Sequence, residues 1–175
     1  MGMSKIAKIA DNKKFYDGAA LTERMKEHQV CAVSIALVEN YKISEACAFG
    51  VKRKATKEKL TTDTIFQAAS ISKPVFAVGV MRLVERGVLD LDTDISEYLV
   101  GYEVPPFENK KLKVTLRQLL SHHAGLTLHG FVGYRQGQRI PTVEQILTGT
   151  FPANHLKLKH FREPEVGCQY SGGGI

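Results

Sequence analysis

Two apolar segments joined by a short connection constrain the fold of this chain more than any other feature. Residues 30–38, VCAVSIALV, are apolar at nearly every position, and residues 42–51, KISEACAFGV, follow after the turn-like sequence Glu39-Asn40-Tyr41. Apolar runs separated by a turn are typical of an antiparallel hairpin, and strands without polar alternation are typical of burial. We therefore predict a buried hairpin, which needs further strands to complete a sheet.

Helical patterns lie on both sides of this hairpin. Residues 16–28 place apolar side chains near one face, with Asp17 as a possible cap, and predict an amphipathic helix. Residues 74–86 carry valines and a methionine at three- and four-residue spacing, and Gly87 follows. This pattern predicts a largely buried helix that ends at the glycine.

Two shorter helices are marked by capping boxes, in which Thr115 is followed by Gln118 and Thr142 by Gln145. Residues 87–165 contain no further strongly alternating segment. We expect an α+β fold, an antiparallel sheet flanked by helices plus a helical subdomain. Residues 1–65 would hold the N-terminal helix and first strands, and residues 66–175 the longer helix and the helical subdomain.

Length and composition exclude several classes of protein. The chain has 175 residues, 43% of them hydrophobic, which is enough for one real core. Its net charge of +6 includes a basic cluster, but no aromatic residues alternate with these cations, so a nucleic-acid partner is not expected. No apolar run reaches the length of a membrane span, and the N-terminal residues lack the apolar core of a signal peptide. The cellular compartment and the oligomeric state are left open. The basic cluster comprises Lys52, Arg53, Lys54, Lys57 and Lys59.

Cysteine, histidine and aspartate spacing indicates no metal and no disulfide framework. The three cysteines form no C-x-x-C pair, and adjacent His122 and His123 diverge too far on a helix to bind one metal. His155 and His160 are interpreted as solvated loop residues. The alternating aspartates Asp90, Asp92 and Asp94 lack the glycine and distal glutamate of a calcium loop, so turn and capping roles are preferred. No cofactor is expected.

The pair Ser70 and Lys73 is the first candidate for chemistry. Side chains three residues apart on a helical turn share a face, so an amine can reach a hydroxyl, as a serine nucleophile with a lysine base requires. Burial and the positive end of a helix would both favour the neutral amine of Lys73. The opposing interpretation is that Ser70 is an N-cap and Lys73 points into solvent. Pro74 favours a tight turn over residues 70–73 before the regular helix.

Tyr170 is a second candidate proton carrier. It lies in CQYSGGGI, where a glycine-rich turn would expose its hydroxyl, although a packed tyrosine is the simpler interpretation. The abrupt end of this segment on three glycines and one apolar residue predicts that the chain is truncated.

Taken together, these segments make the sequence resemble the serine β-lactamases and penicillin-binding proteins. The resemblance is to the branch that includes class C β-lactamases, D-alanyl-D-alanine carboxypeptidases and related esterases. The resemblance runs in order from about Val30 to Ile175. It covers the Ser-x-x-Lys helix and the acidic loop after it, the segment VTLRQLLSHHAGL, and REPEVGCQYSGGG, which is similar to the stretch carrying the family's Y-x-N motif. His122 matches a histidine usual in this family, and we interpret it as structural.

The resemblance implies roles for individual residues. Ser70 would be the acylated nucleophile, with its backbone N–H as one half of the oxyanion hole, and Lys73 its base or proton relay. Tyr170 would activate Ser70 and protonate the leaving group, while Ser171 and Gly172 would contact the substrate. The implied reaction is acyl transfer from an ester, an amide or D-amino-acid peptide, or a β-lactam to Ser70, followed by hydrolysis without a metal.

Two departures from the family pattern qualify this expectation. Gly172 stands where the family often has asparagine, which makes β-lactam hydrolysis less expected than esterase or peptidase activity. The K-T-G or H-x-G strand is missing, so the chain resembles the N-terminal half of a hydrolase. The alternative is a non-catalytic truncated paralogue that serves as a binding or assembly element.

Overall fold

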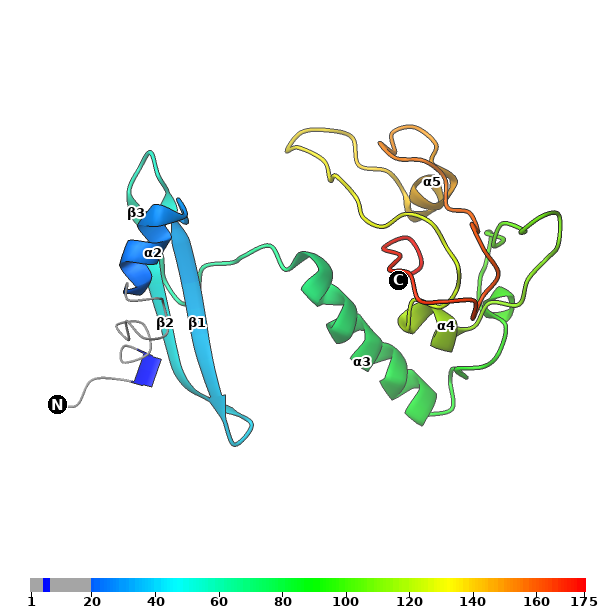
Figure 1. Ribbon diagram of the computed structural model, residues 1–175, viewed down its shortest axis with the longest axis horizontal. Helices are drawn as coiled ribbons and strands as arrows, with labels where there is room; N and C mark the ends of the chain where they lie inside the picture. The colour runs from blue at the N-terminus through cyan, green and yellow to red at the C-terminus, as the bar shows by residue number, and fades with distance from the viewer. Residues whose placement is uncertain (1–4, 7–19) are drawn as a thin grey trace. The chain divides into compact units, whose positions relative to one another are not determined.

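The computed structural model describes residues 5–6 and 20–175 of the chain (Figure 1). The chain divides into two compact units, Met1–Gln67 and Ala68–Ile175, and each is described by itself. The elements in chain order are α2 (Leu21–Glu27), β1 (Ala32–Glu39), β2 (Lys42–Arg53), β3 (Glu58–Lys59), the 3₁₀ turn η1 (Ala69–Ile71), α3 (Ser72–Glu85), the 3₁₀ turn η2 (Ile95–Glu97), α4 (Leu116–Leu120) and α5 (Val143–Thr148).

The first unit contains the predicted hairpin. β1 and β2 pair antiparallel, from Ala32 opposite Gly50 to Glu39 opposite Lys42. Asn40 and Tyr41, which connect the two strands, have positive φ angles of 50° and 62°. Such angles occur in the tight turns that suit the twist of paired strands. The hairpin prediction is therefore confirmed.

The prediction that this hairpin is buried is wrong for the described part of the chain. No residue of β1 or β2, all of them described, is buried, and Val38 and Ile43 are 62% and 69% exposed. Met25 of α2 is buried and lies beside Gly50. A three-stranded sheet beside one short helix cannot cover both apolar faces of its strands.

The N-terminal helix begins later than its sequence pattern indicates. The proposed cap Asp17 and residues 16–19 lie outside the described residues. α2 starts after Ala20, whose backbone N–H donates to the Glu23 carboxylate at 2.9 Å. This bond satisfies a free donor at the helix start, so Glu23 holds the end of the helix without a polar cap residue.

The basic cluster lies partly in strands. β2 extends through Lys52 and Arg53 and pairs with the short strand β3, which the sequence analysis missed. Lys52 forms an ion pair with Glu58 at 2.9 Å. A two-residue strand is too short to produce a periodic pattern, so only this pairing across the turn reveals it.

The second unit begins with the longest helix of the described residues. η1 runs directly into α3, which ends before Gly87, a residue with φ of 69°. The helix, a tight turn before it and its glycine end are confirmed, but the turn covers Ala69–Ile71 and the helix begins at Ser72, two residues before Pro74. The prediction of extensive burial is wrong, because only Val80 of the fully described α3 is buried, while Val75 and Val78 are 70% and 64% exposed.

The core of the second unit is built mainly from connecting segments. Its buried residues lie on η2, before and after α4, and near the C-terminal part, and residues of α4 and α5 pack against them. Both predicted capping boxes are present, since the hydroxyls of Thr115 and Thr142 accept from the backbone N–H groups of Gln118 and Gln145. The buried residues are Ile95, Val114, Ala124, Leu126 and Leu158.

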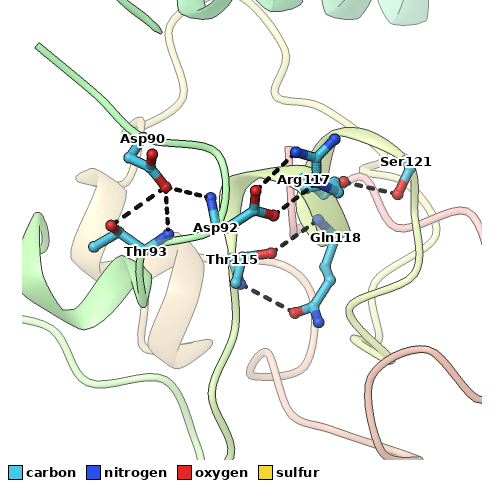
Figure 2. A network of polar contacts seen from close by, with 7 residues as sticks. All are labelled: Asp90, Asp92, Thr93, Thr115, Arg117, Gln118 and Ser121. Carbon is cyan, nitrogen blue, oxygen red and sulfur yellow. Dashed lines mark hydrogen bonds and ion pairs between the residues drawn. The ribbon is translucent and has the colours of Figure 1, made fainter. Parts of the chain in front are cut away.

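The acidic loop after α3 has the predicted turn and capping roles (Figure 2). Asp90 accepts from the backbone N–H groups of Asp92 and Thr93, and Asp94 caps η2. Asp92 has a further role that its spacing did not reveal, a two-bond ion pair with Arg117 of α4 at 2.7 and 2.8 Å. The loop is thereby tied to the start of α4.

The interpretation as solvated residues is wrong for His160 and holds only in part for His155, which is half-buried. His160 is 6% exposed and forms an antiparallel bridge with Leu126, which draws it into the core. The ring of His155 lies 4.8 Å from that of Phe131. Such long-range pairings leave no local sequence signal.

These observations confirm the α+β class, with a small antiparallel sheet and helices. Residues 87–165, which are all described, contain no strand, and their only β-pairing is in isolated bridges. No helix in the described ranges is long and apolar enough to cross a membrane. Within the same residues, no cluster of metal-ligating side chains is found.

Candidate active site

Ser70 and Lys73 lie at the junction of η1 and α3. Ala69, just before the serine, has φ of 46°, a left-handed conformation that is rare for a residue with a side chain. The turn leaves Ser70 exposed and places the Lys73 ammonium 3.5 Å from its hydroxyl oxygen. Ser70 is therefore not the N-cap of α3, whose capping position is Ile71 and carries no side-chain cap.

Tyr170 meets this pair from the far end of the second unit. Its phenol donates a hydrogen bond of 2.7 Å to the Ser70 hydroxyl oxygen, although one hundred residues separate the two in sequence. The Lys73 ammonium lies 5.1 Å from the centre of the Tyr170 ring. The structure thus brings together all three side chains for which catalytic roles were predicted, and those roles stay predictions.

The surroundings of Tyr170 favour its ionised form. The pKa of the phenol is lowered first by its interaction with the Lys73 ammonium and then by its hydrogen bond with Ser70, while partial burial acts in the opposite direction. A neighbouring cation stabilises the phenolate, so the phenol loses its proton at a lower pH than the phenol of free tyrosine does. Chemically, the arrangement can take the hydroxyl proton of Ser70.

The backbone at Ser70 offers a donor for negative charge. Its N–H has no acceptor among the described residues. An unpaired N–H beside a nucleophile is a suitable partner for the oxygen of a tetrahedral intermediate. This geometry is consistent with the predicted half of an oxyanion hole.

Ser171 and Gly172 are held by their own chain. Ser171 is 4% exposed, and its hydroxyl donates to the Thr127 carbonyl at 2.6 Å and accepts from the Gly174 N–H at 3.0 Å. Gly172 donates to the His129 carbonyl oxygen at 3.2 Å, and a Cβ on it would lie 2.9 Å from that oxygen. The predicted substrate contacts of both residues stay predictions, and the Ser171 hydroxyl is engaged within the turn.

Two histidines flank the Tyr170 ring. The ring centroids of His122 and His129 lie 4.5 and 4.9 Å from that of Tyr170. The sequence predicts a structural role for His122, whereas no sequence signal indicates His129. No local spacing signals either contact, because both histidines lie more than forty residues before Tyr170.

An open recess adjoins the lysine. It has a volume of about 330 Å³, and Lys73 is the one charged residue among those that line it. Its two aromatic side chains, Phe76 and Phe131, are 58% and 44% exposed. The lining residues are Ser72, Lys73, Phe76, Phe131, Gly172 and Ile175.

The Ser-x-x-Lys sequence, placed here where η1 runs into α3, is the nucleophile motif of serine β-lactamases and penicillin-binding proteins. The chain belongs to the beta-lactamase family, because the Beta-lactamase family model matches residues 19–148.

Individual relatives carry several activities in their names. Penicillin-binding protein 4* of Bacillus subtilis is 30% identical over 129 residues, which are 73% of this chain and 26% of that protein. Esterase EstB of Burkholderia gladioli is 28% identical over 62% of this chain and 28% of its own length. The crystal structure of D-amino acid amidase from Ochrobactrum anthropi SV3 matches 86% of this chain and 39% of that chain, with 26% identity and a TM-score of 0.67. The matched segments thus span well under half of each relative.

Proposed function

We propose that the protein is a serine hydrolase that forms an acyl-enzyme on Ser70 and acts on esters or amides. The observation that carries this proposal is the contact of Ser70 with both Lys73 and Tyr170, at 3.5 and 2.7 Å. Membership of the beta-lactamase family, with relatives named as esterase, amidase and penicillin-binding protein, supports it.

The proposed reaction has two steps. Ser70 attacks the substrate carbonyl as its hydroxyl proton passes to the Tyr170 phenolate, with Lys73 stabilising that anion or relaying the proton. The backbone N–H of Ser70 binds the oxyanion, and Tyr170 returns the proton to the leaving alcohol or amine as the C–O or C–N bond breaks. Water then attacks the acyl-enzyme by the same proton path, releasing the acid and restoring Ser70.

Gly172 directs the proposal towards esters and amides and away from β-lactams. Asparagine is frequent at this position in the family, but here a side chain would press against the His129 carbonyl oxygen, 2.9 Å from the Cβ position. The backbone therefore approaches too closely for an asparagine amide to be placed without a shift. Gly172→Asn is accordingly expected not to produce β-lactam hydrolysis.

The recess beside Lys73 indicates an apolar substituent on the substrate. Two phenylalanine rings offer contact area to an alkyl or aryl group, and burial of such a group contributes about 25 cal/mol per Å² of apolar surface. Esters with aryl or branched acyl groups are therefore expected to react faster than acetyl esters. Phe131→Ala is expected to narrow that difference.

The test is intact mass spectrometry of the purified chain before and after exposure to a fluorophosphonate, beside a Ser70→Ala control. The proposal predicts one adduct, mapped to the peptide that contains Ser70 and missing from the control. An unlabelled chain that folds normally would contradict the proposal and favour the alternative of a non-catalytic binding or assembly element.

A further inference from the structure

We propose that His122 is a positioning residue for Tyr170. It accepts hydrogen bonds from the backbone on both sides of the tyrosine and thereby holds the phenol against Ser70. This inference deepens the proposed function and rests on it. The sequence predicts a structural role for His122 without saying what it holds, and the contacts of this residue identify Tyr170.

The hydrogen bonds of His122 enclose Tyr170. Its backbone carbonyl accepts from the N–H of Gln169 at 2.9 Å, and its Nδ1 accepts from the N–H of Ser171 at 3.3 Å. The residues immediately before and after Tyr170 are therefore both tied to one histidine. The imidazole also lies against the phenol ring, with centroids 4.5 Å apart and planes inclined by 39°.

His122 is itself held firmly in place. Its backbone N–H donates to the Leu119 carbonyl at 3.0 Å, at the end of α4, and its φ of 61° turns the chain out of the helix. The start of α4 is anchored in turn, because Arg117 binds the Asp92 carboxylate through two hydrogen bonds (Figure 2) and donates its N–H to the Leu91 carbonyl. The position of Tyr170 is thus fixed, through His122, relative to the anchored helix α4.

The hydrogen bond from the Ser171 N–H to Nδ1 of His122 depends on a neutral imidazole. Nδ1 accepts a hydrogen bond, so the ring proton must be on Nε2, and a doubly protonated ring would present a donor to another donor. The pKa of His122 is lowered first by burial, then by the positive charge of Lys73 and by His123. Among the described residues, the titratable groups around the ring are Lys73 on α3, His123 beside it and the phenol of Tyr170. Because the pKa of His122 is lowered, the hydrogen bond to Nδ1 persists to a pH below the ordinary pKa of histidine and is lost as the pH falls through the lowered value.

The matched variants are His122→Gly and His122→Asn. Glycine adopts the positive φ without strain but removes the acceptor, whereas asparagine tolerates that φ and offers an oxygen near the place of Nδ1. We expect His122→Gly to lower the rate of fluorophosphonate labelling of Ser70 about 10- to 100-fold, as loss of alignment at a reacting centre does. We expect His122→Asn to restore most of that rate. His123→Asn is the control, because the His123 Nδ1 contacts Ser121 instead.

The pH profile separates positioning from simple packing. Below the pKa of His122, the slope of log rate against pH should be greater by one in the wild type than in His122→Asn. The difference corresponds to the one additional proton that the wild type must lose. A residue that only fills space would give the two proteins parallel profiles.

The titration of the Ser171 amide in a ¹⁵N-labelled sample gives an answer that does not depend on activity. The amide is expected to shift in step with the protonation of His122 in the wild type and not in His122→Asn. Failure of the wild type to be labelled at Ser70 would overturn the proposed function alone, and the amide titration would then decide the inference about His122. Equal labelling rates in wild type and His122→Gly, or a Ser171 amide that ignores His122, would overturn the inference.

Discussion

The helix α3 and the loop-built core of the second unit differ in how they hold their residues. α3 is the longest helix of the described residues, yet it buries Val80 alone. The core around α4 consists mostly of connecting segments, yet it buries Val114 completely and Leu126 and Leu158 almost completely. Regular secondary structure and burial are therefore separate properties in this unit.

The candidate site combines the two regions. The turn η1 and the start of α3 supply Ser70 and Lys73 by local spacing, whereas the loop-built region supplies Tyr170 through long-range hydrogen bonds. The local pair needs only a turn, but the third member needs the whole packed region. We infer that changes in α3 act mainly on chemistry and changes in the core mainly on stability.

Loss of the Lys73 amine should have the largest effect. Lys73→Met is expected to lower the labelling rate of Ser70 by about 10² to 10⁴, the range for a positioned proton-transfer group. Without the cation, the pKa of Tyr170 rises back towards its ordinary value of 10.0, so the rise of rate with pH shifts to higher pH. Rate profiles from pH 5 to 11 measure both effects. Lys157 is exposed, and Lys157→Met serves as the charge control. A comparable loss of labelling rate in that variant would contradict the role assigned to Lys73.

A side chain at Gly125 should have the largest effect on stability. This residue has φ of 68°, and a Cβ on it would overlap the Arg162 carbonyl oxygen. Left-handed strain and overpacking together predict that Gly125→Ala loses about 3 kcal/mol or more in the free energy of unfolding. Urea unfolding followed by circular dichroism measures it. A midpoint equal to that of the wild type would show that this segment is not tightly packed.

Truncation of two valines compares the regions directly. Val114→Ala should cost about 2 kcal/mol, because it removes two fully buried methyl groups and leaves a cavity. Val75→Ala on α3, where the side chain is 70% exposed, should change the unfolding free energy by less than about 0.5 kcal/mol. Equal losses in the two variants would mean that the exposed face of α3 is covered in solution.

The smallest effect should come from Gly79 in α3. Apart from its two chain neighbours and the backbone of its own helix, no atom of the described residues lies within 4 Å of a Cβ built on Gly79. Gly79→Ala should therefore raise the free energy of unfolding by about 0.5–1 kcal/mol, the difference in helix propensity between the two residues. A decrease in the urea midpoint would show that α3 has a close neighbour at this position.

Local features of the fold could be predicted from the sequence because neighbouring residues determine them. The hairpin connection at Asn40 and Tyr41 and the capping boxes at Thr115 and Thr142 depend on a few adjacent residues, and all are present. The proximity of Ser70 and Lys73 belongs to the same class.

Burial could not be predicted in this way, because it depends on what covers a surface. The valine pattern of α3 indicates a buried helix, but the described chain covers only Val80. His160 looks like a loop residue, yet its bridge to Leu126 places it in the core. The hydrogen bonds that His122 accepts from both neighbours of Tyr170 likewise arise from tertiary packing across more than forty residues.

The central claim is that Tyr170, brought from the loop-built region, activates Ser70 on the turn η1. The most direct measurement is the second-order rate constant for fluorophosphonate labelling of Ser70 in wild type and Tyr170→Phe at the same pH. Phenylalanine keeps the ring against His122 and removes only the hydroxyl that lies 2.7 Å from Ser70. The account predicts a decrease of about 10² to 10⁴ with unchanged thermal unfolding. An unchanged rate constant would contradict it and leave Ser70 and Lys73 as a pair that works without the tyrosine.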